Sequence, residues 1–134
     1  MSCDPVSVQG HYAYSTQNAY TIGCGHAYSK SILAVYDVQN PQIIKTVAEV
    51  ELEEPYGIAA EGNWLYVCEN NTGVLIFDIS NPAFPVYSHE IPMANSRDII
   101  LNYPFMLVSS LSNVQLYNYS DINNITLVST FQTK

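Results

Sequence analysis

The feature that most constrains this 134-residue chain is an internal repeat of about 40 residues. Residues 32–41, ILAVYDVQNP, and residues 73–82, GVLIFDISNP, are apolar, β-branched runs that reach an aspartate and end at an Asn-Pro turn. A weaker third copy, NVQLYNYSD at residues 113–121, places Asn118 where the others have the aspartate. Repeats of this length are typical of architectures in which each unit needs its neighbours to complete a core.

Each repeat unit predicts four short strands. In the second unit the predicted strands are residues 56–60, 63–68, 74–79 and 85–91, with Gly, Asn and Pro in the turns between them. Residues 74–77 are apolar at every position, which suits a sheet covered by a neighbour on both faces. No stretch shows the period of an amphipathic helix.

We therefore expect an all-β, β-propeller-like fold of three four-stranded antiparallel blades that form an incomplete ring. The expected blades cover residues 4–52, 55–92 and 96–132, within one partial propeller domain over residues 1–134. Aromatic residues that alternate along the second strands, such as Tyr14, Trp64 and Tyr66, are expected to pack between blades.

The second unit resembles the LVIVD-repeat family of bacterial and archaeal propellers. The resemblance rests on GNWLYV at residues 62–67 and VLIFDISNP at residues 74–82, and it is weakest in the third unit, where Asp121-Ile122 replaces Asn-Pro. The family implies a propeller, often on secreted or surface-attached proteins, with no general enzymatic activity. It supplies no catalytic residues for this chain.

Propellers close with about four to eight blades, so three blades leave two apolar faces uncovered. Either the chain is a piece of a longer propeller, which we expect, or copies assemble. Two copies would form a homodimer that completes a six-bladed ring with two-fold symmetry.

The net charge of −8, from 12 acidic residues against four basic ones, argues against several partners. Nucleic-acid binding needs lysines and arginines to neutralise phosphates. No apolar run reaches the length of a membrane helix, so we expect no membrane insertion. A protein or small ligand of unknown identity remains as the partner, and no cofactor is expected.

One segment does not fit the repeat. Residues 17–30, QNAYTIGCGHAYSK, make the connection between the second and third strands of the first unit longer than its counterparts. Cys24 and His26 lie in it, and Cys3 is expected at the same rim. A Cys3–Cys24 disulfide, inert thiols, and a metal or catalytic site are the alternatives for this cluster.

Asp37 and Asp78 recur once per unit, which favours a structural role in the turn that follows over a repeated cation ligand. A different set of residues marks the candidate ligand face at the mouth of the channel, where the first strand of each blade begins. This set comprises Asp4, His26, Glu54, Tyr56, Arg97 and Asp98.

These observations predict a non-enzymatic propeller that acts as a binding or interaction scaffold, in a bacterial exported or cell-surface protein. The location could be extracellular, at the cell surface or periplasmic, although no signal peptide is visible in the sequence. The first alternative is an enzyme or metal-binding site at the channel mouth, formed with further blades. The second is a purely architectural module of a larger surface protein.

Overall fold

The computed structural model describes residues 5–20 and 29–133, which form strands and turns. The strands make three separate four-stranded antiparallel sheets, in each of which sequence neighbours pair. The first sheet contains β1 (Val6–Gln9), β2 (Tyr12–Gln17), β3 (Ile32–Asp37) and β4 (Lys45–Glu51). The second contains β5 (Pro55–Glu61), β6 (Trp64–Glu69), β7 (Gly73–Asp78) and β8 (Val86–Pro92). The third contains β9 (Ser96–Asn102), β10 (Phe105–Ser110), β11 (Asn113–Asn118) and β12 (Thr126–Gln132). The predicted all-β fold of three four-stranded blades in an incomplete ring is confirmed.

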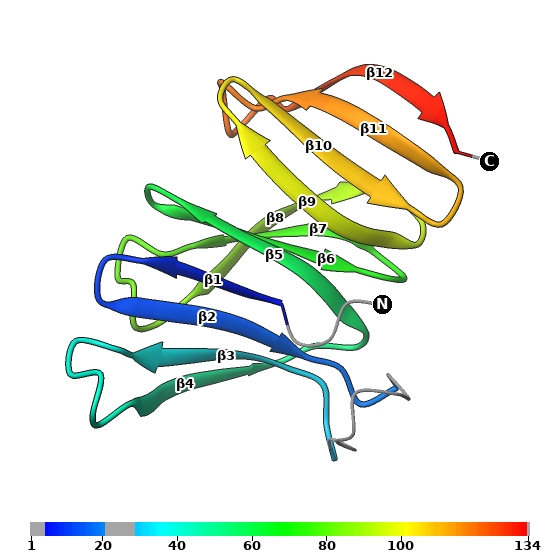
Figure 1. The fold of residues 1–134 in the computed structure, drawn as a ribbon. Helices are drawn as coiled ribbons and strands as arrows, with labels where there is room; N and C mark the ends of the chain where they lie inside the picture. The colour runs from blue at the N-terminus through cyan, green and yellow to red at the C-terminus, as the bar shows by residue number, and fades with distance from the viewer. Residues whose placement is uncertain (1–4, 21–28, 134) are drawn as a thin grey trace.

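The sheets are stacked, and Figure 1 shows the second sheet between the first and the third. The first strands of the sheets lie close together, since β5 packs against both β1 and β9. Gly57 allows part of this approach, because a Cβ added there would lie 2.7 Å from the Cα of Asp98. A side chain at that position would push β5 and β9 apart.

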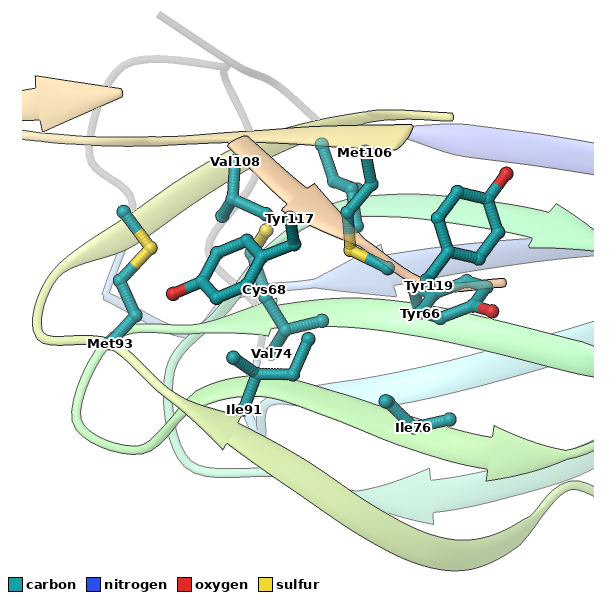
Figure 2. Packing of buried hydrophobic residues seen from close by; sticks show 11 residues of the cluster. Tyr66, Cys68, Val74, Ile76, Ile91, Met93, Met106, Val108, Tyr117 and Tyr119 are labelled. Carbon is teal, nitrogen blue, oxygen red and sulfur yellow. The ribbon is translucent and has the colours of Figure 1, made fainter. Parts of the chain in front are cut away.

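Two hydrophobic clusters fill the spaces between the sheets, and β6 contributes to both. Its buried Leu65 packs with Tyr14 of the first sheet. The next residue, Tyr66, points to the other side and packs with Met106 of the third sheet, as the cluster in Figure 2 shows. Apolar residues on both faces of one strand therefore serve two cores, which is why the strands lack simple alternation. Trp64, which was expected to pack between blades, is half-buried against the cluster between the second and third sheets.

The turn after each third strand is built in the same way in all three sheets. The backbone N–H groups of Gln39 and Ser80 donate to Oδ1 of Asp37 and Asp78, at 2.9 and 2.7 Å. In the third sheet, Ser120 N donates to Oδ1 of Asn118 at 2.9 Å. The amide thus replaces the carboxylate as acceptor, and the departure seen in the sequence does not change the turn.

An irregularity of pairing recurs at one repeat position as well. The register between third and fourth strands shifts after Val35, Ile76 and Leu116 in the three sheets. A bulge at the same place in each sheet indicates that the backbone itself repeats, beyond the apolar pattern.

The outer face of the third sheet is apolar and exposed. Leu107 is 39% exposed and Phe131 57% exposed. They stand at the repeat positions of Tyr66 and Ile91, which lie in the cluster between the second and third sheets. This face therefore carries apolar side chains at the positions that the preceding sheet uses to hold its neighbour.

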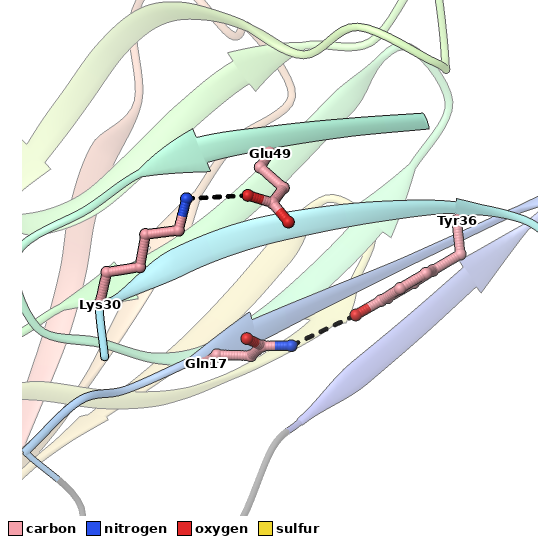
Figure 3. A network of polar contacts seen from close by, with 4 residues as sticks. All are labelled: Gln17, Lys30, Tyr36 and Glu49. Atoms are coloured by element: carbon pink, nitrogen blue, oxygen red, sulfur yellow. Dashed lines mark hydrogen bonds and ion pairs between the residues drawn. The ribbon is translucent and has the colours of Figure 1, made fainter. Parts of the chain in front are cut away.

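The outer face of the first sheet differs from it. Ala13 stands at the repeat position of Leu65, and two polar pairs lie elsewhere on this sheet. Figure 3 shows Lys30 Nζ donating to Glu49 Oε2 at 2.9 Å, and Gln17 Nε2 donating to Tyr36 Oη at 3.3 Å. Small and polar side chains thus replace the large apolar ones.

Candidate functional site

The candidate ligand face lies on the rim where β5 and β9 begin. The connections at this rim include residues 52–54 between β4 and β5, residues 70–72 between β6 and β7, and residues 93–95 between β8 and β9. Because the strands of each sheet run antiparallel, these connections meet at one end of the stack. We call this end the entry rim and the end with the Asp turns the Asp rim.

Tyr56 and Arg97 begin equivalent strands and contact each other directly on the entry rim. The Arg97 guanidinium carbon lies 4.0 Å from the centroid of the Tyr56 ring. Arg97 Nη1 donates to Asn70 Oδ1 at 2.6 Å, while Asn70 Nδ2 donates to Glu54 Oε2 at 2.8 Å. Tyr56 Oη completes the set by donating to Glu54 Oε1 at 2.7 Å. We call these four residues the rim network.

The rim network joins side chains of both charges across the second and third sheets. Its members are half-buried, so the contacts are partly shielded from water. Burial, followed by the hydrogen bond to Glu54, raises the pKa of Tyr56 above its usual value, so the phenol remains a donor at neutral pH. The sequence singled out Glu54, Tyr56 and Arg97, and the structure brings these three together.

Glu69 lies beneath the rim network with 2% of its surface exposed. Its carboxylate accepts hydrogen bonds from the backbone N–H of Glu53 at 3.0 Å and from that of Glu54 at 3.0 and 3.1 Å. Ser96 Oγ donates to the Glu69 carbonyl at 3.0 Å. Sequence reasoning placed Glu69 in a turn and missed this role, because only the fold shows that the side chain points inward.

Asp98 belongs to the same rim but not to the network. Its Oδ1 accepts from the backbone N–H of Ile99 at 2.9 Å, and the residue is exposed. It lies on the face that carries Leu107, since Ser109 pairs with Asp98 and Leu107 with Ile100. Asp98 nevertheless stays close to the other candidates, because a Cβ added at Gly57, the residue after Tyr56, would lie 2.7 Å from the Asp98 Oδ1.

Four of the residues that the sequence singled out lie in parts of the chain that the structure does not describe. Asp4, His26, Cys3 and Cys24 lie outside the described residues, as does any disulfide between the two cysteines. Cys68 is described, and it is a free, fully buried thiol. Burial raises the pKa of this thiol to about 12, which keeps it protonated and unreactive.

A groove of about 480 Å³ opens on the entry rim between the first and second sheets. Its lining includes Tyr20, Lys30, Glu53, Glu54 and Asn71. The groove therefore adjoins the rim network through Glu54. Side chains of both signs and a phenol offer hydrogen bonds to a polar ligand.

Asp37 and Asp78 lie at the opposite end, on the Asp rim, where each accepts the turn hydrogen bond described above. The N–H of Ser80 lowers the pKa of Asp78, because it stabilises the carboxylate. Within residues 5–20 and 29–133, no group of three or more His, Cys, Asp or Glu side chains is arranged to hold a metal ion. The same part of the chain contains no helix that is long and apolar enough to span a membrane.

Comparison with protein-family models matches residues 56–91 to the LVIVD repeat. The match covers nearly all of the second sheet, from the second residue of β5 to the next-to-last residue of β8, so this sheet is similar to an LVIVD repeat. A comparison with curated proteins gave no match. The first and third sheets have the same strand order and the same turn after the third strand, so the three sheets form a propeller-like array.

Proposed function

We propose that this chain is a non-enzymatic binding scaffold of a bacterial exported or cell-surface protein, with the entry rim as its working face. The observation that carries the proposal is the rim network next to the groove of about 480 Å³. Tyr56 and Arg97 are different residue types at one repeat position, so the repeat itself does not dictate the residue there. A fixed polar surface of this kind suits recognition of a protein or a polar small ligand.

The chemistry of the described rim favours a scaffold over an enzyme. The carboxylate of Glu54 accepts hydrogen bonds from two side chains, and that of Glu69 holds two backbone N–H groups. Such carboxylates are committed to the structure and are poorly suited to proton transfer. Cys68 has no access to solvent, so it does not serve as a nucleophile.

A matched pair of lysine substitutions tests the working face. Asn71 is exposed on the entry rim, and Gln39 is exposed on the Asp rim, so Asn71→Lys and Gln39→Lys change charge equally at opposite ends. Proteins and small ligands from the medium and envelope of the source cells are captured on the full chain, and each ligand's affinity is then measured. We expect Asn71→Lys to weaken binding about tenfold or more, and Gln39→Lys to leave it unchanged.

Other outcomes decide against the proposal. A ligand lost with Gln39→Lys but kept with Asn71→Lys would place the working face elsewhere. Turnover of ester, glycoside or phosphate substrates that Glu54→Gln abolishes would establish the enzyme alternative. Fractionation of the source cells tests the location, and recovery of the protein in the cytoplasm alone would contradict export.

The outer face of the third sheet supports a second part of the proposal, concerning assembly. Leu107 and Phe131 occupy positions that hold a neighbouring sheet elsewhere in the stack, so we propose that a further sheet of the same repeat covers them. For the 134-residue chain by itself, another copy supplies that sheet, and two copies would complete a six-bladed ring. Burial of such apolar surface contributes about 25 cal/mol per Å².

A further inference from the structure

A second groove lies on the Asp rim, between the second and third sheets, with a volume of about 290 Å³. Its lining includes four aromatic side chains and one carboxylate: Trp64, Tyr66, Tyr103, Tyr119 and Glu61. Tyr103 is 65% exposed, and Glu61 is exposed too, so the groove opens to solvent. It is remote from the entry rim, because the Asp turns lie at the other end of the sheets.

The aromatic rings meet at steep angles around Tyr119. The Tyr119 ring lies 5.9 Å from the Tyr66 ring, with 76° between their planes, and 5.7 Å from the Tyr103 ring, at 84°. Tyr66 and Tyr119 are seen together at one end of the cluster in Figure 2. Rings held nearly perpendicular to one another present π faces and edges to the same space. Tyr66 and Tyr119 are themselves buried, so this arrangement is fixed before any ligand arrives.

The carboxylate is held in place as well. Tyr119 Oη donates to Glu61 Oε1 at 2.9 Å. Burial raises the pKa of Tyr119, and the hydrogen bond to Glu61 raises it further, so the phenol stays protonated and continues to donate. The hydrogen bond orients a negatively charged group at the edge of an aromatic groove.

The equivalent place between the first and second sheets shows that this set is not part of the repeat. There Gln9 stands in place of Glu61, Gly62 in place of Tyr103, and Ile79 in place of Tyr119. Gln9 Nε2 donates to the Gly62 carbonyl at 2.6 Å, which closes the turns against each other. The first interface thus uses these positions for packing, whereas the second combines aromatic rings with a carboxylate.

We propose that the groove around Glu61, Tyr103 and Trp64 binds an organic cation of the quaternary ammonium type, such as a choline group. The faces of aromatic rings attract cations, and aromatic cages are a common way to recognise quaternary ammonium. Glu61 adds an opposite charge, and the chain's net charge of −8 favours cations over anions. The lining also includes Asn63 and Ser120, which could hydrogen-bond to a neutral sugar, so a sugar is the competing ligand that the titration below includes.

The chain provides its own reporter for this site. Trp64 is the single tryptophan of the sequence and lies in the lining of the groove. Choline chloride is titrated into the full chain at constant ionic strength, and Trp64 fluorescence is recorded. We expect a saturable change with choline, and none with 3,3-dimethylbutanol, which has the same shape without the charge.

Two substitutions test separately how much the negative charge and the ring surface contribute to choline binding. Glu61→Gln keeps an oxygen for the Tyr119 hydroxyl but removes the charge, and we expect it to weaken choline binding about fivefold or more. Tyr103→Leu removes an exposed ring and is expected to weaken binding about threefold. Glu90→Gln, an exposed carboxylate of β8 outside the groove, is the matched control and should bind choline as the unmodified chain does. Circular dichroism verifies that each variant is folded.

The site is also separable from the entry rim, since Asn71→Lys should leave choline binding unchanged. Equal binding of choline and 3,3-dimethylbutanol would overturn the proposal, because charge would then play no part. So would equal loss in Glu61→Gln and Glu90→Gln, which would indicate a general charge effect. A fluorescence change with cellobiose but not with choline would make the groove a sugar site, and no saturable change with choline would rule out the cation site.

Discussion

Two adjacent residues of β10 point to opposite sides of the third sheet, and replacing each by alanine tests the stacking of the sheets. Met106 is fully buried in the cluster between the second and third sheets, whereas Leu107 is 39% exposed on the outer face. Met106→Ala removes buried atoms and leaves a cavity, so we expect it to lower the free energy of unfolding by about 2 to 5 kcal/mol. Leu107→Ala removes atoms already partly in water and leaves no enclosed cavity, so a loss of about 1 kcal/mol is expected.

Equilibrium urea unfolding followed by Trp64 fluorescence measures both losses. The measurement is made at low protein concentration, where association through the outer face contributes least. A Met106→Ala loss at least about 1 kcal/mol larger than that of Leu107→Ala is the expected result. Equal losses, or a larger loss for Leu107→Ala, would refute the argument that the inner face of the third sheet packs on the second and the outer face is free.

Three further predictions concern buried ionisable groups. Burial raises the pKa of Tyr66 and Tyr119 above the usual 10.0. The stability that these phenols contribute is therefore intact below pH 10 and is lost as pH rises through their higher folded-state pKa. In a pH titration of the folded chain, the phenolate absorbance of these residues should appear at higher pH than that of free tyrosine. Cys68, with its pKa at about 12, should resist alkylation until urea unfolds the chain, as measured by mass spectrometry of its peptide. Glu69→Ala should cost about 1 to 3 kcal/mol, because two backbone N–H groups lose their acceptor, and Glu69→Gln should cost less.

Each of these has a result that would count against it. Titration of all tyrosines near pH 10 with the chain still folded would mean that Tyr66 and Tyr119 are accessible. Rapid alkylation of Cys68 in native buffer would show that the cluster between the second and third sheets is open to solvent. A Glu69→Ala chain as stable as the unmodified one would mean that water replaces the carboxylate at the loop.

The repeat made most of the fold predictable. Apolar runs recur at a fixed spacing, and each ends in an Asx turn. The turn sets where the strand ends, independently of what packs against the strand. The turn at Asn118 illustrates the limit of a letter-by-letter comparison: asparagine differs from aspartate in the sequence, yet its side-chain oxygen accepts the same backbone hydrogen bond.

The candidate site was predictable only in part. The repeat positions of Tyr56 and Arg97 predicted that both lie on one rim, because equivalent strands begin at the same end in a stack of equal units. It also placed Glu69 and Asn70 on this rim, but not their hydrogen bonds, because the partners lie on other loops and depend on how the sheets are spaced. The groove beside Glu61 was missed for the same reason, since it exists only where the turns of two sheets meet.

The central claim is that the chain is a stack of three repeat units whose last apolar face requires another unit. Size-exclusion chromatography with light scattering, at micromolar concentration, tests it most directly on the unmodified chain and on a Leu107→Lys, Phe131→Lys variant. We predict that the unmodified chain associates, so that its measured mass exceeds the 14.9 kDa of one chain. The variant should be a folded monomer. A sharp monomer peak for the unmodified chain, with a cooperative melt, would show that three units suffice and would contradict the claim.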